Sequence, residues 1–520
     1  LEVFTRSHID LTNSYFSEGD KALVIFDEST GTIAHNRFAQ YAKAIHVNNA
    51  EVEIRKNDFE YNAIAIHKDT AEDMLIRMHA EDNWWGGTTG VVVLDELDEF
   101  EPVHTNVVVG NILVSPWSSA PNTVKSDMLC CSSVLFLPGL MGSRLYEKGS
   151  LFENQLWEPN RNGDVKKLFM DESGESLHTA IYTRDIMRTT NLLGGSTSLE
   201  VSPYKAFSSY LDKLVKEKTI TEWKEAPYDW RFAPDSIIQD GTRIGNGKSV
   251  NVQYMADNVI ELAHRSKTKK VTIITHSNGG LVAKMLMLEL QSRGKDRLVD
   301  RIIYIGMPEY GTPQAITSLL FGHEQSIAGG LVLKASIAKE LGKNMPTAYT
   351  LLPSDLFFGD STTRTFTIRA GDSSVKNTNE LHTVLFSYPH VNKDLLKKAS
   401  QIHQKLSSWS PRSELQIFQI VGTGLLTVSG VQKLDSKKFV PIYSQTGDGV
   451  VQDMFDVHTK RFQRTGHVIA IDLSKEISPE GLSEYKHLNL TNTPTVLSWI
   501  DSLLRNTSSV PAGIDADELN

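Results

Sequence analysis

The segment from Lys270 to Leu290 constrains the fold more than any other part of this sequence. Val271 to Ile274 is a short apolar, β-branched run that is typical of a buried parallel strand. Leu281 to Leu290 consists of good helix formers, and Gly294 follows where a helix ordinarily ends. Almost no loop remains between strand and helix, so the turn between them must be very tight. We therefore predict a strand, a sharp turn and a helix, with Ser277 at the apex of the turn.

A turn of this kind suits a nucleophilic serine, because it lifts one hydroxyl above the sheet. The residues two before and two after the serine must be small so that the backbones can approach, and here they are Thr275 and Gly279. A serine hydroxyl also needs a base to take its proton and a carboxylate to orient that base. The alternative is that Thr275 to Gly280 forms only a polar turn. The position between a buried strand and a long helix favours the catalytic interpretation.

Candidate partners for Ser277 occur later in the chain. Asp448 lies in a Gly-Asp-Gly turn after a predicted strand at Phe439–Tyr443, and His487 precedes the last predicted helix. The order Ser, Asp, His is the order that the hydrolase fold uses. The alternatives are that Asp448 is only a turn residue, with Asp453 or Asp456 as the acid, and that His487 is structural. We predict Ser277 as nucleophile, Asp448 as orienting acid and His487 as general base.

Length and composition limit the other functions. A chain of 520 residues exceeds what one hydrophobic core usually organises, so we expect two domains. A net charge of −10 without a basic block argues against nucleic acid or an anionic membrane as a partner. No apolar run approaches the roughly 18 residues of a spanning helix. Adjacent Cys130 and Cys131 give no disulfide framework and no metal-ligand spacing, so we expect no metal and no organic cofactor.

The first 117 residues repeat at intervals of roughly 21 to 26 residues, a period found in solenoids. Each repeat is an alternating run that ends in Asn-x-aromatic, and a second short strand falls between successive aromatics. We predict stacked coils resembling the right-handed parallel β-helix family, with a β-sandwich as the alternative. The acids of this region alternate as solvated strand faces do, so we predict no active site here. The repeats are Ile9–Tyr15, Ile33–Phe38, Val52–Phe59 and Ile76–Trp85, and the acids are Glu51, Glu53, Asp58 and Glu60.

Residues 118–133 form a polar connector, and from residue 134 strands alternate with helices. This alternation is the signature of a mainly parallel α/β sheet. About a hundred residues after Pro313 have weaker periodicity, which predicts a lid or cap over the site. We expect a catalytic domain over residues 134–507 and an acidic tail or linker over 508–520. Because the chain begins at Leu1 with no export signal, we expect it to be part of a longer protein.

Several motifs in residues 134 to 505 resemble the lecithin:cholesterol acyltransferase family, which includes lysosomal phospholipases. The motifs occur in the family's order, and Ala-Pro-Tyr-Asp-Trp-Arg is the most specific of them. The resemblance implies an α/β-hydrolase fold and the same three catalytic residues. The motifs are Leu137–Leu145, Leu156–Pro159, Ala226–Arg231, Thr275–Gly280, Thr312–Pro313, Leu351–Ser354, Gly447–Gly449 and His487.

The resemblance also implies that the backbone N–H groups of Leu140 and Asn278 form the oxyanion hole. We expect a further set of residues to support the pocket wall or lid rather than to perform chemistry. The chain departs from the family in having no cysteine pair for a lid disulfide and in carrying polar Asn278 after the nucleophile. The supporting residues are Met141, Tyr228, Asp229, Trp230 and Arg231, with Asp229 and Arg231 placed to pair.

From these residues we expect a serine-dependent lipid acyl-ester hydrolase or O-acyltransferase, acting through an acyl-enzyme. Its substrate would be a lipid or another ester, met at a membrane or micelle surface, in an extracellular or cell-surface location. Two alternatives stay open. One is a non-catalytic adhesin or binding protein that uses the repeats, and the other is an esterase acting on non-lipid esters. The oligomeric state is not indicated by the sequence.

Overall fold

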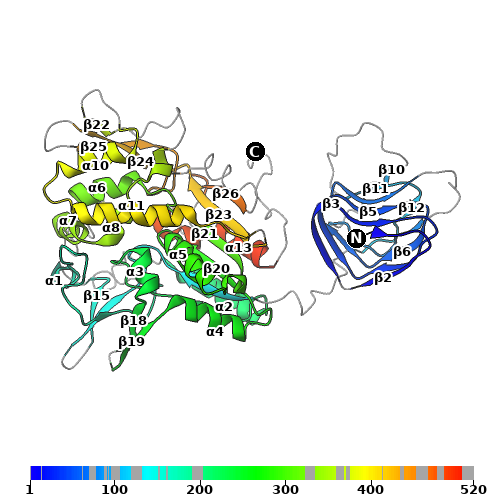
Figure 1. Cartoon of the computed structure of the whole chain (residues 1–520), viewed down its shortest axis with the longest axis horizontal. Helices are drawn as coiled ribbons and strands as arrows, with labels where there is room; N and C mark the ends of the chain where they lie inside the picture. The colour runs from blue at the N-terminus through cyan, green and yellow to red at the C-terminus, as the bar shows by residue number, and fades with distance from the viewer. Residues whose placement is uncertain are drawn as a thin grey trace. The chain divides into compact units, whose positions relative to one another are not determined.

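The computed structural model divides into two compact units, Leu1–Leu129 and Cys130–Asn520 (Figure 1). The structure describes most of the chain, and the fold is given for these parts only. The predicted connector over 118–133, the rival acids Asp453 and Asp456, and the acidic tail lie largely or wholly outside them. The described residues are 2–12, 14–60, 62–69, 78–86, 91, 93–94, 106–118, 132–149, 153–159, 162–189, 203–246, 248–322, 334–358, 368–370, 375–412, 414–433, 439–452, 466–476 and 485–505.

The N-terminal unit is built from parallel strands whose partners lie about one repeat apart. Ile9 pairs with Gly31 and Gly31 with Val52, while Phe16 pairs with Phe38 and Phe38 with Phe59. One sheet contains β1 (Glu2–Val3), β3 (Tyr15–Ile25), β5 (Arg37–Val47), β7 (Asp58–Glu60), β8 (Ile64–Lys68), β10 (Val93–Leu94) and β11 (Val107–Val109). A second contains β2 (His8–Thr12), β4 (Thr30–Ala34) and β6 (Glu51–Arg55), and a third β9 (Met78–His79) and β12 (Ile112–Leu113).

Asparagines at the corners of this unit hydrogen-bond from one repeat to the next. The Asn36 N–H donates to Asn57 Oδ1 at 2.9 Å, and the Asn57 N–H donates to Asn83 Oδ1 at 2.8 Å. A second ladder joins the Asn62 N–H to Asn106 Oδ1 at 3.1 Å. All five side chains are buried. Each amide therefore satisfies corner backbone groups that no strand can pair.

Two details of the repeat differ from the sequence prediction. The first repeat aligns as Ser14-x-Phe16 rather than as Asn-x-Tyr15, because Phe16 stacks on Phe38 with ring centroids 5.1 Å apart. The stack continues through Phe59 to Trp85. Asp58 and Glu60 are buried rather than solvated. Burial raises the pKa of Glu60, and its neighbour Arg37 opposes that shift through an ion pair.

The C-terminal unit is organised around a six-stranded parallel sheet in the order β17-β13-β20-β21-β23-β26. Alternate side chains of each strand face opposite layers of helices, as a doubly covered sheet requires. Leu135 and Ile273 pack with α3, α4, α5 and α11, whereas Phe136 and Ile274 pack with α2 and α13. The strands are β13 (Ser133–Leu137), β17 (Trp223–Glu225), β20 (Val271–His276), β21 (Val299–Ile305), β23 (Gln416–Thr423) and β26 (Gly466–Asp472). The helices are α2 (Lys205–Lys216), α3 (Pro234–Gln239), α4 (Met255–Arg265), α5 (Gly279–Ser292), α11 (Lys393–Ser408) and α13 (Pro494–Leu504).

The insertion after β21 forms a helical layer with a hydrophobic core of its own, which includes Tyr310, Leu320, Leu381 and Leu396. Its helices are α6 (Pro313–Phe321), α7 (Ala335–Lys343), α8 (Pro346–Thr350), α9 (Asp355–Phe358) and α10 (Thr378–Phe386), followed by α11. Smaller elements complete the unit. They are β14 (Leu145–Lys148), β15 (Glu153–Trp157), α1 (Asn162–Lys166), β16 (Ile181–Tyr182), β18 (Thr242–Gly245), β19 (Val250–Gln253), the 3-10 helices Asp296–Leu298 and η3 (His487–Asn492), β22 (Ile368–Ala370), β24 (Thr427–Lys433) and β25 (Phe439–Ser444).

The predicted strand Phe439–Tyr443 does not belong to the central sheet, because β25 pairs with β24 in a separate small sheet. Helix α4 begins at Met255, directly after β19, which pairs with β18. Helix α2 begins at Lys205 after Tyr204, and neither Tyr204 nor Thr493, which precedes α13, makes a side-chain cap. Among the described residues, no helix is long and apolar enough to cross a membrane.

Candidate active site

The turn between β20 and α5 places Ser277 in a left-handed conformation, with φ of 51°. This conformation is strained for a residue with a side chain, and such strain is typical of a nucleophile elbow. The need for a small residue at position 279 has a direct cause: a Cβ at Gly279 would lie 2.5 Å from the Leu137 carbonyl oxygen. The elbow is thus pressed against the end of β13. Ser277 is 7% exposed, so the prediction of an exposed hydroxyl is wrong.

The structure brings Ser277, His487 and Asp448 into one hydrogen-bonded row. His487 Nε2 lies 2.8 Å from Ser277 Oγ, and His487 Nδ1 lies 2.7 Å from Asp448 Oδ2. Because a carboxylate accepts, Nδ1 carries the proton and Nε2 is left to accept from the serine hydroxyl. The His487 N–H also donates to the Asp448 carbonyl at 2.9 Å. The imidazole is therefore fixed in the tautomer that a general base needs.

Asp448 is held by its own turn. Its Oδ1 accepts hydrogen bonds from the N–H groups of Val450 at 3.0 Å and Val451 at 2.8 Å, and the residue is 1% exposed. Oδ1 is thus occupied by backbone donors while Oδ2 faces His487. Hydrogen bonds to the charged form compensate for the cost of burying a carboxylate. The acid comes from the small β24–β25 sheet, whereas Ser277 comes from the central sheet.

The turn after β13 lies directly against the elbow. A Cβ at Gly139 would come within 2.9 Å of Ser277 Cβ. Within the described residues, neither the Leu140 N–H nor the Asn278 N–H donates to another protein group. Two unengaged amides beside a nucleophile suit the stabilisation of a developing oxyanion. This is the pair that the sequence comparison predicted.

The predicted supporting residues tie the turn after β13 to its surroundings. Tyr228 Oη donates to the Pro138 carbonyl at 2.7 Å and lies 3.4 Å from Asn278 Nδ2. The Asn278 side chain is fully buried, so its polarity does not open the site to water. The Met141 carbonyl accepts from Trp157 Nε1 at 2.8 Å.

Trp230 and the Asp229–Arg231 pair act one layer further out. Trp230 Nε1 donates to the Ser143 carbonyl at 3.0 Å. Arg231 meets Asp229 through two hydrogen bonds, Nε to Oδ1 at 2.9 Å and Nη2 to Oδ2 at 2.6 Å, so the predicted pairing is confirmed. Arg231 Nη1 also donates to the Leu168 carbonyl at 3.0 Å. These residues brace the wall around the oxyanion turn and do not contact Ser277 Oγ.

Two residues near the site were missed by sequence reasoning. Tyr204 Oη lies 2.9 Å from His276 Nδ1, and His276 Nε2 lies 2.8 Å from the His487 carbonyl oxygen. Both residues are almost fully buried. The position of His276 immediately before Ser277 was a usable signal. Nothing in the sequence around Tyr204 indicates its partner, which lies 72 residues away.

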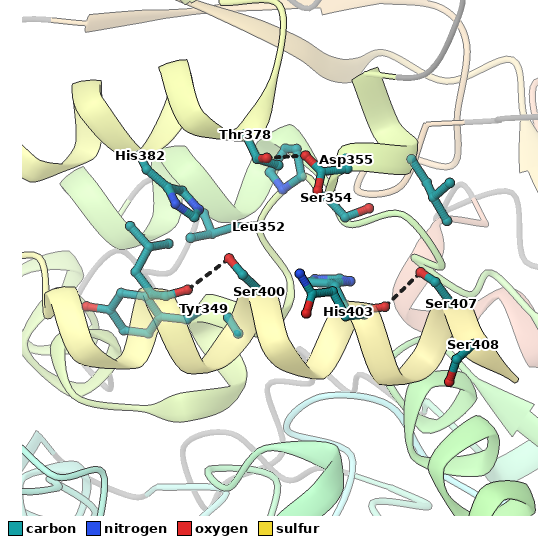
Figure 2. A pocket seen from close by; sticks show the side chains of 15 residues that line it. Tyr349, Leu352, Ser354, Asp355, Thr378, His382, Ser400, His403, Ser407 and Ser408 are labelled. Atoms are coloured by element: carbon teal, nitrogen blue, oxygen red, sulfur yellow. Dashed lines mark hydrogen bonds between the residues drawn. The ribbon is translucent and has the colours of Figure 1, made fainter.

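A cavity of the C-terminal unit lies away from this row of residues. It has a volume of about 420 Å³ and lies between α10, α11 and the segment from Tyr349 to Leu356 (Figure 2). His382 and His403 face it, while Ser277, Asp448 and His487 do not line it. Among the described residues that line this cavity, no hydroxyl has the paired histidine and carboxylate that Ser277 has, so the elbow is the better candidate for a nucleophile.

Among the described residues, one group of side chains could be considered for a metal ion: His46, His67 and Asp69 in the N-terminal unit. The two imidazole rings are stacked 5.1 Å apart with only 16° between their planes. Lone pairs in nearly parallel planes cannot converge on one ion, and Lys43 already contacts His67 Nδ1. His46 Nε2 instead pairs with Asp69 at 2.8 Å. We therefore treat the group as a surface ladder and assign no metal to it.

Comparison with known proteins points to the same part of the chain. The family model described as lecithin:cholesterol acyltransferase matches residues 195–405, which contain Ser277 but neither Asp448 nor His487. A phosphatidylcholine-sterol acyltransferase from Papio anubis is 26% identical over 172 residues. That alignment covers 31% of this chain and about a third (35%) of the relative's length.

Solved structures with low sequence identity also align with this chain. The Tle4–Tli4 complex aligns with 13% identity and a TM-score of 0.42, covering 73% of this chain and 99% of the other. Lipase 1 from Pelosinus fermentans aligns with 12% identity and a TM-score of 0.30, covering 73% and 99%. Both TM-scores lie below 0.5, so the description of the fold rests on the sheet and helices given above.

Proposed function

We propose that the C-terminal unit is an α/β hydrolase that acts as a serine-dependent lipid acyl-ester hydrolase or O-acyltransferase. The observation that carries the proposal is the hydrogen-bonded row of Ser277, His487 and Asp448. The match of residues 195–405 to the lecithin:cholesterol acyltransferase model supports a lipid ester as the substrate class. The strained φ of Ser277 supports the role of nucleophile, because strained backbone conformations cluster at active sites.

The mechanism follows from the proton positions. His487 Nε2 accepts the proton of Ser277 as Oγ attacks the ester carbonyl, and Asp448 stabilises the imidazolium that forms. The amides of Leu140 and Asn278 hold the oxyanion, each contributing about 3 to 4 kcal/mol to lowering the barrier. His487 then protonates the leaving alcohol. Water or a second alcohol, activated by the same imidazole, takes the acyl group from Ser277.

Water is the default acceptor in this proposal. At about 55 M it outcompetes a dilute alcohol unless the site binds the alcohol or excludes water. The absence of a cysteine pair for a lid disulfide supports this preference. The Asn278 side chain does not add to this preference, because it is buried. The preference for water therefore depends mainly on the high concentration of water.

Labelling by a fluorophosphonate probe tests the nucleophile. We expect stoichiometric labelling of the full chain at Ser277, located by peptide mass, and no labelling of Ser277→Ala. The matched control is Ser292→Ala, at the exposed end of the same helix. Absence of labelling in the wild-type chain would reject the hydrolase and favour a binding protein.

A lipid assay tests the substrate class and the acceptor. A labelled phospholipid in mixed micelles with a long-chain alcohol should give free fatty acid as the main product. New ester as the main product would overturn the preference for hydrolysis. Turnover of a short p-nitrophenyl ester without turnover of any lipid would instead identify an esterase for non-lipid esters.

We also propose that residues 1–117 are a right-handed parallel β-helix joined by a connector, residues 118–133, to a catalytic domain over 134–507. The one-repeat register, the two asparagine ladders and the aromatic stack support the β-helix. Separate hydrophobic cores support independent folding of the halves. A chain of residues 124–507 should remain soluble and hydrolyse a short ester within about threefold of the full chain. Insolubility of that fragment would place the boundary elsewhere.

A further inference from the structure

A continuous chain of buried hydrogen bonds joins the oxyanion turn to the backbone of His487. It begins at the Gly139 N–H, which donates to Tyr204 Oη at 2.8 Å. It continues from Tyr204 Oη to His276 Nδ1 at 2.9 Å and ends at His276 Nε2, 2.8 Å from the His487 carbonyl oxygen. The four segments involved are the turn after β13, the start of α2, the end of β20 at the elbow, and η3. No step of the triad mechanism uses these groups.

The direction of each hydrogen bond in the chain is fixed by chemistry. A carbonyl oxygen only accepts, so His276 Nε2 must carry a proton. Burial, with a smaller contribution from nearby His487, lowers the pKa of His276 to about 3, so the ring is neutral and Nδ1 is a bare acceptor. Tyr204 must then donate its hydroxyl proton to Nδ1. The remaining lone pairs of its oxygen accept from the Gly139 N–H.

We infer that Tyr204 and His276 are positioning residues, which lock the oxyanion turn and the general base to the elbow through this directed chain. His276 is the residue directly before Ser277. The hydrogen-bond chain therefore fixes the positions of the oxyanion turn and of His487 relative to the nucleophile. The rings themselves are packed: His276 lies 5.6 Å from Tyr204 and 5.1 Å from His487 between ring centroids. The inference rests on the proposed function, since it assigns a role in serving Ser277.

The arrangement has a physical advantage over separate contacts. Hydrogen bonds in a buried chain polarise one another, and each buried group that loses its partner is costly. The oxyanion amides and His487 must both lie within a few tenths of an ångström of their productive places. One shared chain makes their displacement cooperative, so that moving one end disturbs the other.

Tyr204→Phe is the first test, because it removes one oxygen and retains the ring that packs on Phe136. We expect kcat for a short ester to fall about 10- to 100-fold with KM changed less than about twofold, as for a displacement of less than 1 Å. The matched control is Tyr349→Phe. Its hydroxyl likewise donates one hydrogen bond, here to the Lys343 carbonyl, and accepts one from a backbone N–H, that of Asn392. It should lose similar stability and retain kcat.

His276 is tested by a pair of substitutions. His276→Gln retains one donor and one acceptor, whereas His276→Leu retains only volume. We expect the glutamine variant to keep at least about tenfold more kcat than the leucine variant. Equal activity of the two would show that His276 only fills space, and would overturn the inference.

A spectroscopic measurement separates this inference from the proposed function. In wild-type protein with ¹⁵N-labelled histidine, His276 should be the neutral tautomer with its proton on Nε2, because Nε2 faces the His487 carbonyl. Tyr204→Phe should keep that tautomer and shift the Nδ1 resonance, because Nδ1 loses its hydrogen-bond donor. If fluorophosphonate labels Ser277 but Tyr204→Phe changes neither kcat nor the Nδ1 resonance, the inference fails and the function stands. If the wild-type chain is not labelled, the function fails, and the Nδ1 resonance decides whether the directed chain exists.

Discussion

The two units of this protein bury polar side chains in opposite ways. In the N-terminal unit one residue type recurs at one corner, and each ladder bond between Asn36, Asn57 and Asn83 spans 21 or 26 residues. In the C-terminal unit the important contacts are unique. His487 reaches Ser277 across 210 residues and His276 across 211. In the repeats, the same kind of buried hydrogen bond occurs several times, so the loss of one leaves the others in place. In the C-terminal unit each contact occurs once, so the loss of one side chain removes that contact entirely.

The largest effect should come from breaking the unique contacts of the site. Ser277→Ala and His487→Ala should each lower ester turnover at least about a thousandfold, because triad members act as a unit. The melting temperature should change by only a few degrees, since each substitution removes a small group. Steady-state kinetics and calorimetry measure the two effects. Retention of more than about a hundredth of the wild-type turnover by either variant would reject the assignment.

The second effect concerns a buried ion pair, and it should lower the free energy of unfolding of the C-terminal unit. Lys284 on α5 lies 2.8 Å from Glu309 in the loop after β21, and their side chains are 3% and 2% exposed. Lys284→Met should destabilise this unit by about 3 to 5 kcal/mol, because it leaves a carboxylate buried without its counter-charge. Urea unfolding measures the change. The double variant Lys284→Met with Glu309→Gln should recover most of the loss, and failure to recover would mean that packing rather than charge is responsible.

A ladder asparagine should have a smaller and more local effect. Asn57→Ala removes the acceptor of the Asn36 N–H and the donor to the Ile33 carbonyl. We expect a loss of about 1 to 3 kcal/mol, seen as faster hydrogen exchange in the adjacent repeats with ester turnover unchanged. Glu53→Ala, an exposed position on β6, is the control. Reduced turnover in Asn57→Ala would show that the two units are energetically coupled.

The last effect is a change in the pH dependence of stability, which is absent at neutral pH and appears only as the pH falls below about 6.5. Burial lowers the pKa of His403 from 6.5 to about 4. The unfolded chain therefore takes up this proton first, so the stability is present above pH 6.5 and is lost as the pH falls toward 4. His403→Gln should remove a slope of up to about 1.4 kcal/mol per pH unit in that window. Urea unfolding at several pH values measures it, with the exposed His264→Gln as control.

The comparison also explains what the sequence predicts well. The elbow was predictable because its strand, its turn and its helix are contiguous in the sequence. Its small residue at Gly279 is required by the close approach of the Leu137 carbonyl. The repeats were predictable because an Asn recurs at the same corner of successive repeats, at a nearly constant spacing. The exception is the first repeat, where Tyr15 fits the pattern as well as Phe16 does and only the stack on Phe38 decides.

Features that depend on non-local pairing were not predictable. Phe439–Tyr443 reads as a central strand because its residues are apolar, but β24 pairs with it before the main sheet can. Asp448 was correctly singled out only from its turn and its order in the chain. Tyr204 gives no local signal, since its importance depends on a histidine 72 residues away. The burial of Glu60 is compensated by Arg37 in the preceding repeat, which alternation alone does not reveal.

The turn that holds Asp448 has a consequence for engineering. Asp448 Oδ1 accepts from the amides of Val450 and Val451, and the Gly449 N–H donates to Thr427 Oγ1 at 2.9 Å. The contacts of Oδ1 thus come from the same turn, residues 447–452, and only Oδ2 reaches outside it, to His487. Exchange of this turn as a block between related chains should therefore preserve the orientation of the carboxylate wherever a histidine faces Oδ2.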